Sequence, residues 1–158
     1  MLIISDTSPI TNLIRIGQLD ILKKLFKEVV IPQQVYEELL NYENQKSAIE
    51  QRTWIVMMKV KDREQVKELE IKLDAGEAEA IVLAHELKAD MLIIDERKGR
   101  IIAEEYGLKI IGLLGVLLKA KREGYLKELK PIMDRLIDEI GFRVSTDLYD
   151  RILKEAKE

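Results

Sequence analysis

Two short apolar runs in the sequence each end at an aspartate. MLIIS precedes Asp6, and MLII, at residues 91–94, precedes Asp95. Uninterrupted apolar runs are typical of parallel strands buried on both faces, and open parallel sheets bind ligands beyond the carboxyl ends of their strands. We therefore expect both carboxylates at one edge of a sheet, if the two strands lie close together. The alternative is that each aspartate only caps the helix that follows it.

The capping alternative is weaker for Asp6, because the next residues already provide a helix start. Ser8 is a good N-cap, Pro9 suits the first helical position, and Gly17 suits the end of that helix. Thr7, Ser8 and Asn12 also carry hydroxyl and amide groups that could orient the carboxylate of Asp6 or a water beside it.

A glutamate in the segment LDAGEAEAIVLAHELKA is a further candidate. Glu77 shares a helix face with Ile81 and Ala84, whereas Glu79 is expected on the opposite, polar face with Glu86. A carboxylate on an apolar stripe needs a partner, because carboxylates are rarely buried unpaired. The alternative is an acid that only stabilises the first turn of its helix.

A second glutamate, Glu38, lies in VIPQQVYEELLNY. It follows Val35 by three residues and precedes Tyr42 by four, along the border of the apolar face, while Glu37 is more nearly opposite. Acids on a helix surface are usually only solvated, so this candidate depends on the others being near.

Clustered carboxylates of this kind would bind a divalent cation. They repel one another and cannot all stay ionised in a partly buried pocket without one, and magnesium prefers carboxylate oxygens and water. The chain has no cysteine and a single histidine, which excludes thiolate and multi-histidine metal sites. That histidine, His85, is expected at the surface, and the sequence has no glycine-rich phosphate loop.

A basic run follows Asp95. Arg97, Lys98 and Arg100 stand at the expected start of a helix, where cations are unfavourable against the helix dipole. Two interpretations remain open: these side chains contact phosphates, or they form salt bridges with nearby acids.

The elements that must position these residues alternate between apolar runs and longer amphipathic stretches, a rhythm typical of βαβ units. Pro32 is expected to start a helix, and the chain beyond Leu113 is expected to be helical only, with breaks near Gly124, Pro131 and Gly141. The segment around Trp54 could be an edge strand. The expected strands are Leu2–Ile4, Val29–Ile31, Trp54–Val60, Met91–Ile94 and Lys109–Ile111.

Length and composition favour one compact domain. The chain has 158 residues, of which 47% are hydrophobic, and a net charge of -3, so any nucleic-acid contact needs a local basic patch. No apolar run is long enough to span a membrane, and the N-terminus lacks the features of a signal peptide. We expect a cytoplasmic protein.

The ordered motifs DTSPITNL, VVIPQQVYEEL, LDAGEAEAIVLA and LIIDERKGRIIAEEYGLKIIGLLGVLLKAK resemble the PIN-domain superfamily, specifically a small prokaryotic branch similar to the VapC toxins. The resemblance covers roughly residues 1–125. It implies an α/β fold, a three-layer α/β/α sandwich around a parallel sheet of about four to five strands. Residues 1–158 would form a single PIN-like domain, with 113–158 as a helical C-terminal extension.

The same resemblance implies an acidic pocket that holds one or two magnesium or manganese ions and cleaves single-stranded RNA. By position, the four family acids fall on Asp6, Glu38, Glu77 and Asp95, with all but Glu38 as metal ligands, and Glu96 is a rival to Asp95. The third acid is often aspartate in VapC-type toxins, so Glu77 reaches further by one methylene.

These observations lead to a hypothesis of a metal-dependent endoribonuclease, a hydrolase acting on single-stranded RNA, either alone or as the toxin of a toxin–antitoxin pair. One alternative is a PIN-like module that binds nucleic acid with weak or no turnover. Another is a phosphatase-like enzyme with Asp6 as nucleophile, although Ser8 stands where that class usually has a second aspartate.

The last segment, STDLYDRILKEAKE, carries Leu148, Ile152 and Leu153, which need burial. An antitoxin or a second copy of the chain could supply it, and the resemblance implies frequent dimerisation, so we expect a homodimer. The alternative is that the segment packs on its own domain.

Overall fold

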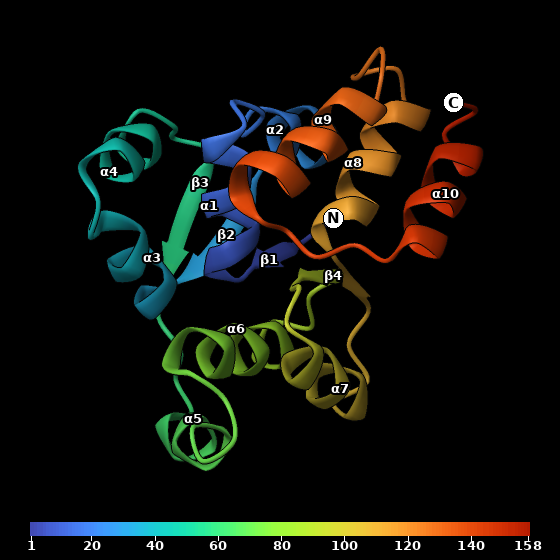
Figure 1. The fold of residues 1–158 in the computed structure, drawn as a ribbon. Coiled ribbons are helices and arrows are strands. Elements are labelled where there is room, and N and C mark those ends of the chain that lie inside the picture. Colours follow the sequence, from blue (N-terminus) through green and yellow to red (C-terminus); the bar gives the residue numbers. More distant parts are fainter.

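A computed structural model describes residues 1–158 as a five-stranded, all-parallel sheet in the order β3-β2-β1-β4-β5 (Figure 1). The predicted α/β class and parallel sheet are therefore confirmed. The strands are β1 (Ile3–Ser5), β2 (Val29–Pro32), β3 (Ile55–Met58), β4 (Met91–Ile93) and β5 (Ile110–Ile111).

The two repeated phrases of the sequence lie side by side in this sheet. β1 and β4 are neighbours, and Ile3 pairs with Met91 and Ser5 with Ile93. The backbone N–H of Asp6 donates to the carbonyl of Ile93 at 3.0 Å, one step beyond the last paired residues. Both aspartates therefore follow the carboxyl ends of adjacent parallel strands.

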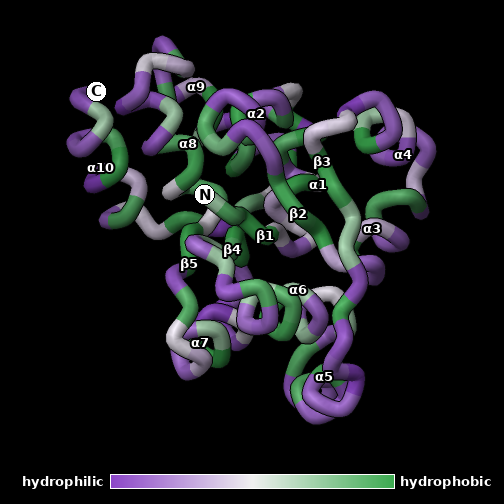
Figure 2. The backbone as a smooth tube through the Cα atoms, turned by 180° about the vertical axis from the view of Figure 1, so that it is seen from behind, coloured by the Kyte–Doolittle hydropathy of each residue, from purple (hydrophilic) through white to green (hydrophobic).

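Helices cover both faces of the sheet, which gives three layers (Figures 1 and 2). Alternate residues of one strand point to opposite faces, so Ile3 belongs to one buried cluster and Ile4 to the other. The helices of the second cluster are α5 (Arg63–Leu69), α6 (Ala75–Glu86) and α7 (Arg97–Glu105). The larger cluster is covered by α1 (Thr7–Arg15), α2 (Ile21–Phe26), α3 (Gln33–Leu40), α4 (Glu43–Glu50), α8 (Leu113–Arg122) and α9 (Lys130–Arg135).

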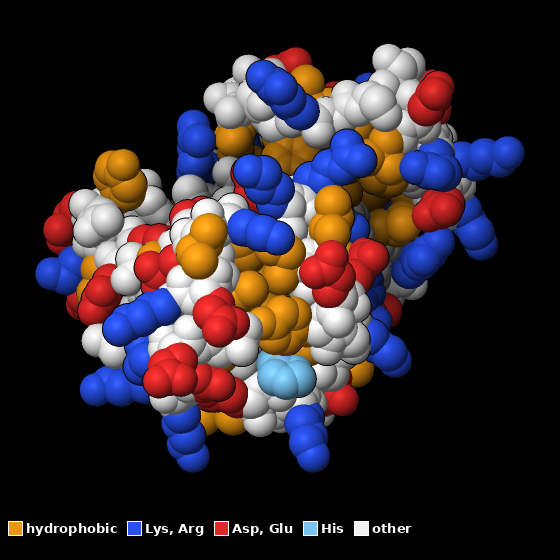
Figure 3. Space-filling model, turned by 90° about the horizontal axis from the view of Figure 1, so that it is seen from below, with side chains coloured by type: hydrophobic (Ala, Val, Ile, Leu, Met, Phe, Trp, Pro, Cys, Tyr) orange, Lys and Arg blue, Asp and Glu red, His pale blue; other side chains and the backbone are white.

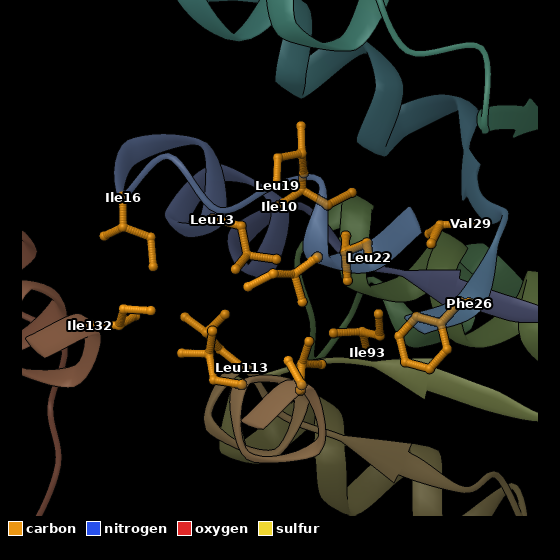
Figure 4. Close-up of a cluster of buried hydrophobic side chains, with 14 of the residues drawn as sticks. Ile10, Leu13, Ile16, Leu19, Leu22, Phe26, Val29, Ile93, Leu113 and Ile132 are labelled. Carbon is orange, nitrogen blue, oxygen red and sulfur yellow. The ribbon is translucent and has the colours of Figure 1, made fainter. Parts of the chain in front are cut away.

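The larger cluster fixes α1 and α8 against the sheet. Figure 4 shows Leu13 of α1, Leu113 of α8 and Ile93 of β4 pointing toward one another, and all three are fully buried. Because α1 begins just after Asp6 and α8 begins just after β5, this packing holds two helix N-termini at the carboxyl end of the sheet.

The start of α1 differs from the prediction. Thr7 is already helical and Asp6 occupies the N-cap position, so the assignment of Ser8 as N-cap is wrong by two residues. The side chain of Asp6 nevertheless makes no capping hydrogen bond. The end of α1 is as predicted, because Gly17 follows the helix with a φ of +68°. The backbone N–H of Gln18 donates to the carbonyl of Leu13 at 2.8 Å and closes the helix.

The strand boundaries differ from the predicted runs by one or two residues: β3, β4 and β5 are shorter, β1 is shifted by one residue, and β2 extends one residue further, to Pro32. The segment around Trp54 does form an edge strand, but it ends at Met58 and not at Val60. At the other edge, β5 has two residues. Strands end where pairing to the neighbour ends, and hydrophobicity alone does not mark that point.

Beyond Leu113 the chain is helical, with α8, α9, the π-helical turn η1 (Leu136–Ile140) and α10 (Thr146–Glu155). Breaks occur near Gly124 and Gly141, but Pro131 lies in the first turn of α9 and starts that helix, because proline suits that position. None of the helices combines the length and the apolar character that a membrane span requires.

The final segment packs on its own domain. Ile152 and Ala156 are part of the larger cluster, and Leu148 and Leu153 pack against it. Glu158 accepts hydrogen bonds from the backbone N–H groups of Leu129 and Lys130, which ties the C-terminus to α9. The argument that these residues require a partner for burial is therefore wrong.

Candidate active site

Asp6 follows the carboxyl end of β1. Together with Glu38, Asp74, Glu77 and Asp95 it forms a cluster of carboxyl groups, here called the acidic group. Asp6 is only 4% exposed. Burial raises the pKa of Asp6 to about 7; the backbone N–H of Thr7 opposes this rise, and the negative charges of Asp74, Glu38 and Asp95 add to it. At neutral pH the carboxyl of Asp6 is thus poised between its two protonation states.

Glu77 points inward from the first turn of α6, as predicted, and is 6% exposed. Burial raises the pKa of Glu77 to about 8, with the neighbouring carboxylates of Asp74 and Asp6 as further causes. Asp74 caps α6 by accepting from the backbone N–H of Glu77 at 2.8 Å. Asp74 was not among the predicted site residues, although its place at the start of DAGE could have revealed it.

Glu38 reaches the same group from α3 and is half-buried, whereas Glu37 is exposed, as predicted. The hydroxyl of Thr7 donates to Glu38 Oε2, and Gln34 Nε2 lies 3.4 Å from Glu38 Oε1. Thr7 therefore contacts Glu38, and this contact links the start of α1 to α3.

Asp95 is the fourth acid. Its Oδ1 accepts from the backbone N–H of Leu113 at 2.8 Å, at the start of α8. Burial raises the pKa of Asp95, while the Leu113 N–H and the charge of Arg100 lower it. Glu96 is exposed and occupies the N-cap position of α7, so the structure favours Asp95 over Glu96 as the inward-facing acid.

Three glycines leave room for three of these carboxylates. A Cβ on Gly76 would lie 2.8 Å from Glu38 Oε2, one on Gly99 would lie 2.7 Å from Glu77 Oε2, and one on Gly112 would lie 2.9 Å from Asp95 Oδ1. None of the three has a positive φ. Close approach of a carboxylate, and not backbone conformation, therefore explains why these positions lack a side chain.

A groove of about 1270 Å³ opens beside Asp95. Ser8, Asn12, Arg97 and Arg100 line it, as do apolar residues of β5, α8 and α10. Lys98 is exposed and lies outside the groove. Two further lining arginines, Arg15 and Arg143, were not predicted.

The four arginines of this groove, Arg15, Arg97, Arg100 and Arg143, form no salt bridge within the chain, and neither does Lys98. Of the two interpretations of the basic run, internal salt bridges are therefore not observed.

A family model described as a PIN domain matches residues 2–158. The chain belongs to the PIN-domain family. No curated protein matches the sequence. PIN domains are generally metal-dependent nucleases, so this chain has a nuclease-type fold.

The acids of this PIN domain suit a divalent metal in their chemistry. The donors are all carboxylate oxygens, two of which, Glu77 Oε2 and Asp95 Oδ2, are buried without a hydrogen-bond partner. As the side chains stand, no three acids are arranged closely enough to hold an ion. Glu38, Glu77 and Asp95 are instead turned toward a protein partner or a glycine.

One prediction about the PIN domain's α6 is wrong. Glu79 was expected to face water, but it is 5% exposed and accepts from the backbone N–H of Gln34 at 3.0 Å and from Arg63 at 2.8 Å. The residues Gly76–Ala84 are buried all round, so α6 has no polar face over this length. His85 is exposed, as predicted, and is the pale blue side chain in Figure 3.

Proposed function

We propose that this PIN domain is a divalent-metal-dependent endoribonuclease that hydrolyses phosphodiester bonds of single-stranded RNA. The observation that carries the proposal is the position of Asp95, which belongs to the acidic group and also lines the arginine groove. A phosphate chain lying in the groove would pass directly beside Asp95.

Asp6, Glu77 and Asp95 would hold one or two magnesium or manganese ions. Such an ion lowers the pKa of a bound water and neutralises charge on the scissile phosphate. Glu38, fixed by Thr7 and Gln34, would orient the attacking water. Asp74 adds negative charge beside Asp6 and Glu77, which strengthens the attraction for a cation.

The groove would bind the substrate on both sides of the cleaved bond. Arg97 and Arg100, together with Arg15 and Arg143, would contact phosphates, since none of them is paired within the chain. Lys98 would contribute only longer-range attraction. The apolar lining of the groove favours single-stranded over double-stranded RNA. The unstacked bases of a single strand expose apolar faces, which a duplex hides. Phe142 is the one aromatic residue available for stacking.

Thr7, Ser8 and Asn12, which follow Asp6 in the sequence, would have different roles in the proposed mechanism. Thr7 holds Glu38. Ser8 and Asn12 line the groove and would donate to the phosphate or to the attacking water.

The phosphatase-like alternative is disfavoured by the environment of Asp6. A carboxyl that is only 4% exposed is hard for a phosphate ester to reach for direct attack. The role of toxin, with an antitoxin and a homodimer, follows from the resemblance to VapC-type proteins, and the well-covered tail offers no additional support for it.

Cleavage of a fluorescently labelled single-stranded RNA in the presence of Mn²⁺ tests the proposal. We expect the wild type to cleave the RNA. EDTA should abolish this cleavage, and so should the substitution Asp6→Asn. Asp20→Asn is the matched control, because Asp20 is exposed and pairs with Arg52 away from the site. RNA binding without cleavage by the wild type would contradict the enzyme and support the binding module.

A further inference from the structure

Glu79 is a buried acid that the proposed chemistry does not use. Its Oε1 accepts from the backbone N–H of Gln34 on α3, and its Oε2 accepts from Arg63 on α5. We propose that Glu79 is a positioning residue that fixes α3 on α6 and thereby sets the place of Glu38 in the acidic group. This inference rests on the proposed function, in which Glu38 orients the attacking water.

The helix α3 depends on Glu79 for the start of its hydrogen bonding. The first backbone N–H groups of a helix have no partner within the helix. The N-cap of α3 is Pro32, which has no side-chain acceptor, and no side-chain capping bond is present there. The carboxylate of Glu79 fills this role at Gln34, where the positive end of the helix dipole also favours a negative charge.

A second contact joins the same two helices one turn away. Gly76, three residues before Glu79 on α6, leaves room for Glu38, four residues after Gln34 on α3. From the Glu79–Gln34 contact to the Gly76–Glu38 contact, the residue number therefore rises along α3 and falls along α6. Two contacts one turn apart constrain both the distance and the angle between α3 and α6.

Arg63 keeps Glu79 separate from the electrostatics of the acidic group. The guanidinium of Arg63 lies 2.8 Å from Glu79 Oε2, and a buried carboxylate needs such a counter-charge. Glu79 therefore acts on the site through the position of α3 and not through its charge.

Three variants separate this role from general stability. Glu79→Ala removes both contacts, whereas Glu79→Gln keeps an acceptor for the Gln34 N–H. Glu86→Ala is the matched control: Glu86 lies on the same helix and also accepts from backbone N–H groups, those of Lys61 and Asp62, but it does not touch α3.

Hydrogen exchange of the α3 amides is measured in the metal-free proteins. Mn²⁺ affinity is then measured by calorimetry, and kcat and KM are measured from RNA cleavage. We expect Glu79→Ala to speed exchange at Gln34 to Glu38 and to lower kcat by about tenfold with KM little changed, as for other residues that orient groups at a metal site. Mn²⁺ affinity should change little, because Glu38 is not one of the proposed metal ligands. Glu79→Gln should restore most of the loss of kcat, and Glu86→Ala should leave kcat and Mn²⁺ affinity near wild type.

A double variant tests whether Glu79 acts through Glu38. If it does, adding Glu79→Ala to Glu38→Gln causes little further loss of kcat, because the two changes remove one interaction. Fully additive losses, or equal losses in Glu79→Ala and Glu86→Ala, would overturn the inference. If the wild type neither binds Mn²⁺ nor cleaves RNA, the proposed function fails, and unchanged exchange of α3 in Glu79→Ala would then overturn the positioning role separately.

Discussion

Asp95 uses one carboxylate oxygen to hold Leu113 and leaves the other free. Its Oδ1 accepts from the Leu113 N–H at 2.8 Å, while its Oδ2 is buried with no partner. The same side chain thus anchors the N-terminus of α8 and keeps a second oxygen without a hydrogen-bond partner. Structural and chemical roles at this position can be separated by choosing the substitution.

Asp95→Asn should keep the fold and lose activity. The amide oxygen can still accept from Leu113, whereas the loss of charge should lower the cleavage rate by on the order of 10²–10³-fold, as for other groups that stabilise charge in a transition state. Asp95→Ala should lose activity equally and also about 1 kcal/mol of stability, because the Leu113 N–H loses its acceptor. Melting curves and cleavage assays of both variants check this; equal melting temperatures would contradict the anchoring role.

The metal-free protein should become less stable as the pH rises from about 4 to about 8. The pKa values of Asp6 and Glu77 are raised to about 7 and about 8, so the folded state holds protons that the unfolded state has released over this range. The free energy of unfolding therefore falls with pH up to the folded pKa values and is level above them. Urea unfolding in EDTA across this range is the measurement, and a flat profile would contradict it.

Mn²⁺ should reverse this loss at pH 8 and have little effect at pH 5. A cation binds the ionised acids of the folded state and raises the melting temperature, while protonated acids bind it poorly. A melting temperature that is indifferent to millimolar Mn²⁺ at pH 8 argues against the metal site.

Asp6→Asn should stabilise the metal-free protein at pH 8 while abolishing activity. The variant removes a charge that is buried among Asp74, Glu38 and Asp95, and the gain should be on the order of 1–3 kcal/mol. Asp20→Asn should act in the opposite direction, because hydrogen bonding to Arg52 lowers the pKa of Asp20, so its ionised form stabilises the fold. Lower stability of Asp6→Asn at pH 8 would show that Asp6 is a structural cap.

Gly99→Ala should weaken Mn²⁺ binding without straining the backbone. The added Cβ would lie 2.7 Å from Glu77 Oε2 and 2.7 Å from Ile94 Cδ1, so Glu77 must move. Gly115→Ala is the control, because its Cβ would meet the apolar Ile111 at the same 2.7 Å but no acid. Calorimetric titration of both variants with Mn²⁺ decides; equal affinities would mean that the room beside Glu77 is unimportant.

The strands and their two aspartates could be predicted because local sequence determines them. Strands buried on both faces must be apolar throughout, so the runs that precede Asp6 and Asp95 are visible without the structure. The placement of Ser8 as N-cap was wrong because several neighbouring residues can cap a helix. Which of them does so depends on where the pairing of β1 ends, and the local sequence does not show that point.

Glu79 could not be placed from the helical period. The prediction assumed one apolar and one polar face, but α6 packs against the sheet and also against α3, α5 and α7. A partner for its carboxylate exists only because Gln34 and Arg63, distant in sequence, meet it in the fold. Asp74 was not predicted as a site residue, and its capping of α6 is seen only in the structure.

The arginines of the groove come from segments that are distant in the sequence. Arg15 and Arg143 are 128 residues apart, so only the folded tail brings them to one surface. Arg143→Ala should weaken RNA binding and reduce the slope of log affinity against log salt by about 0.7, the value for one phosphate contact on a single strand. Arg151→Ala, an exposed change on α10 outside the groove, should leave that slope unchanged. Fluorescence anisotropy over a range of salt concentrations, with EDTA present to prevent cleavage, measures both; equal slopes for Arg143→Ala and the wild type would place the RNA elsewhere.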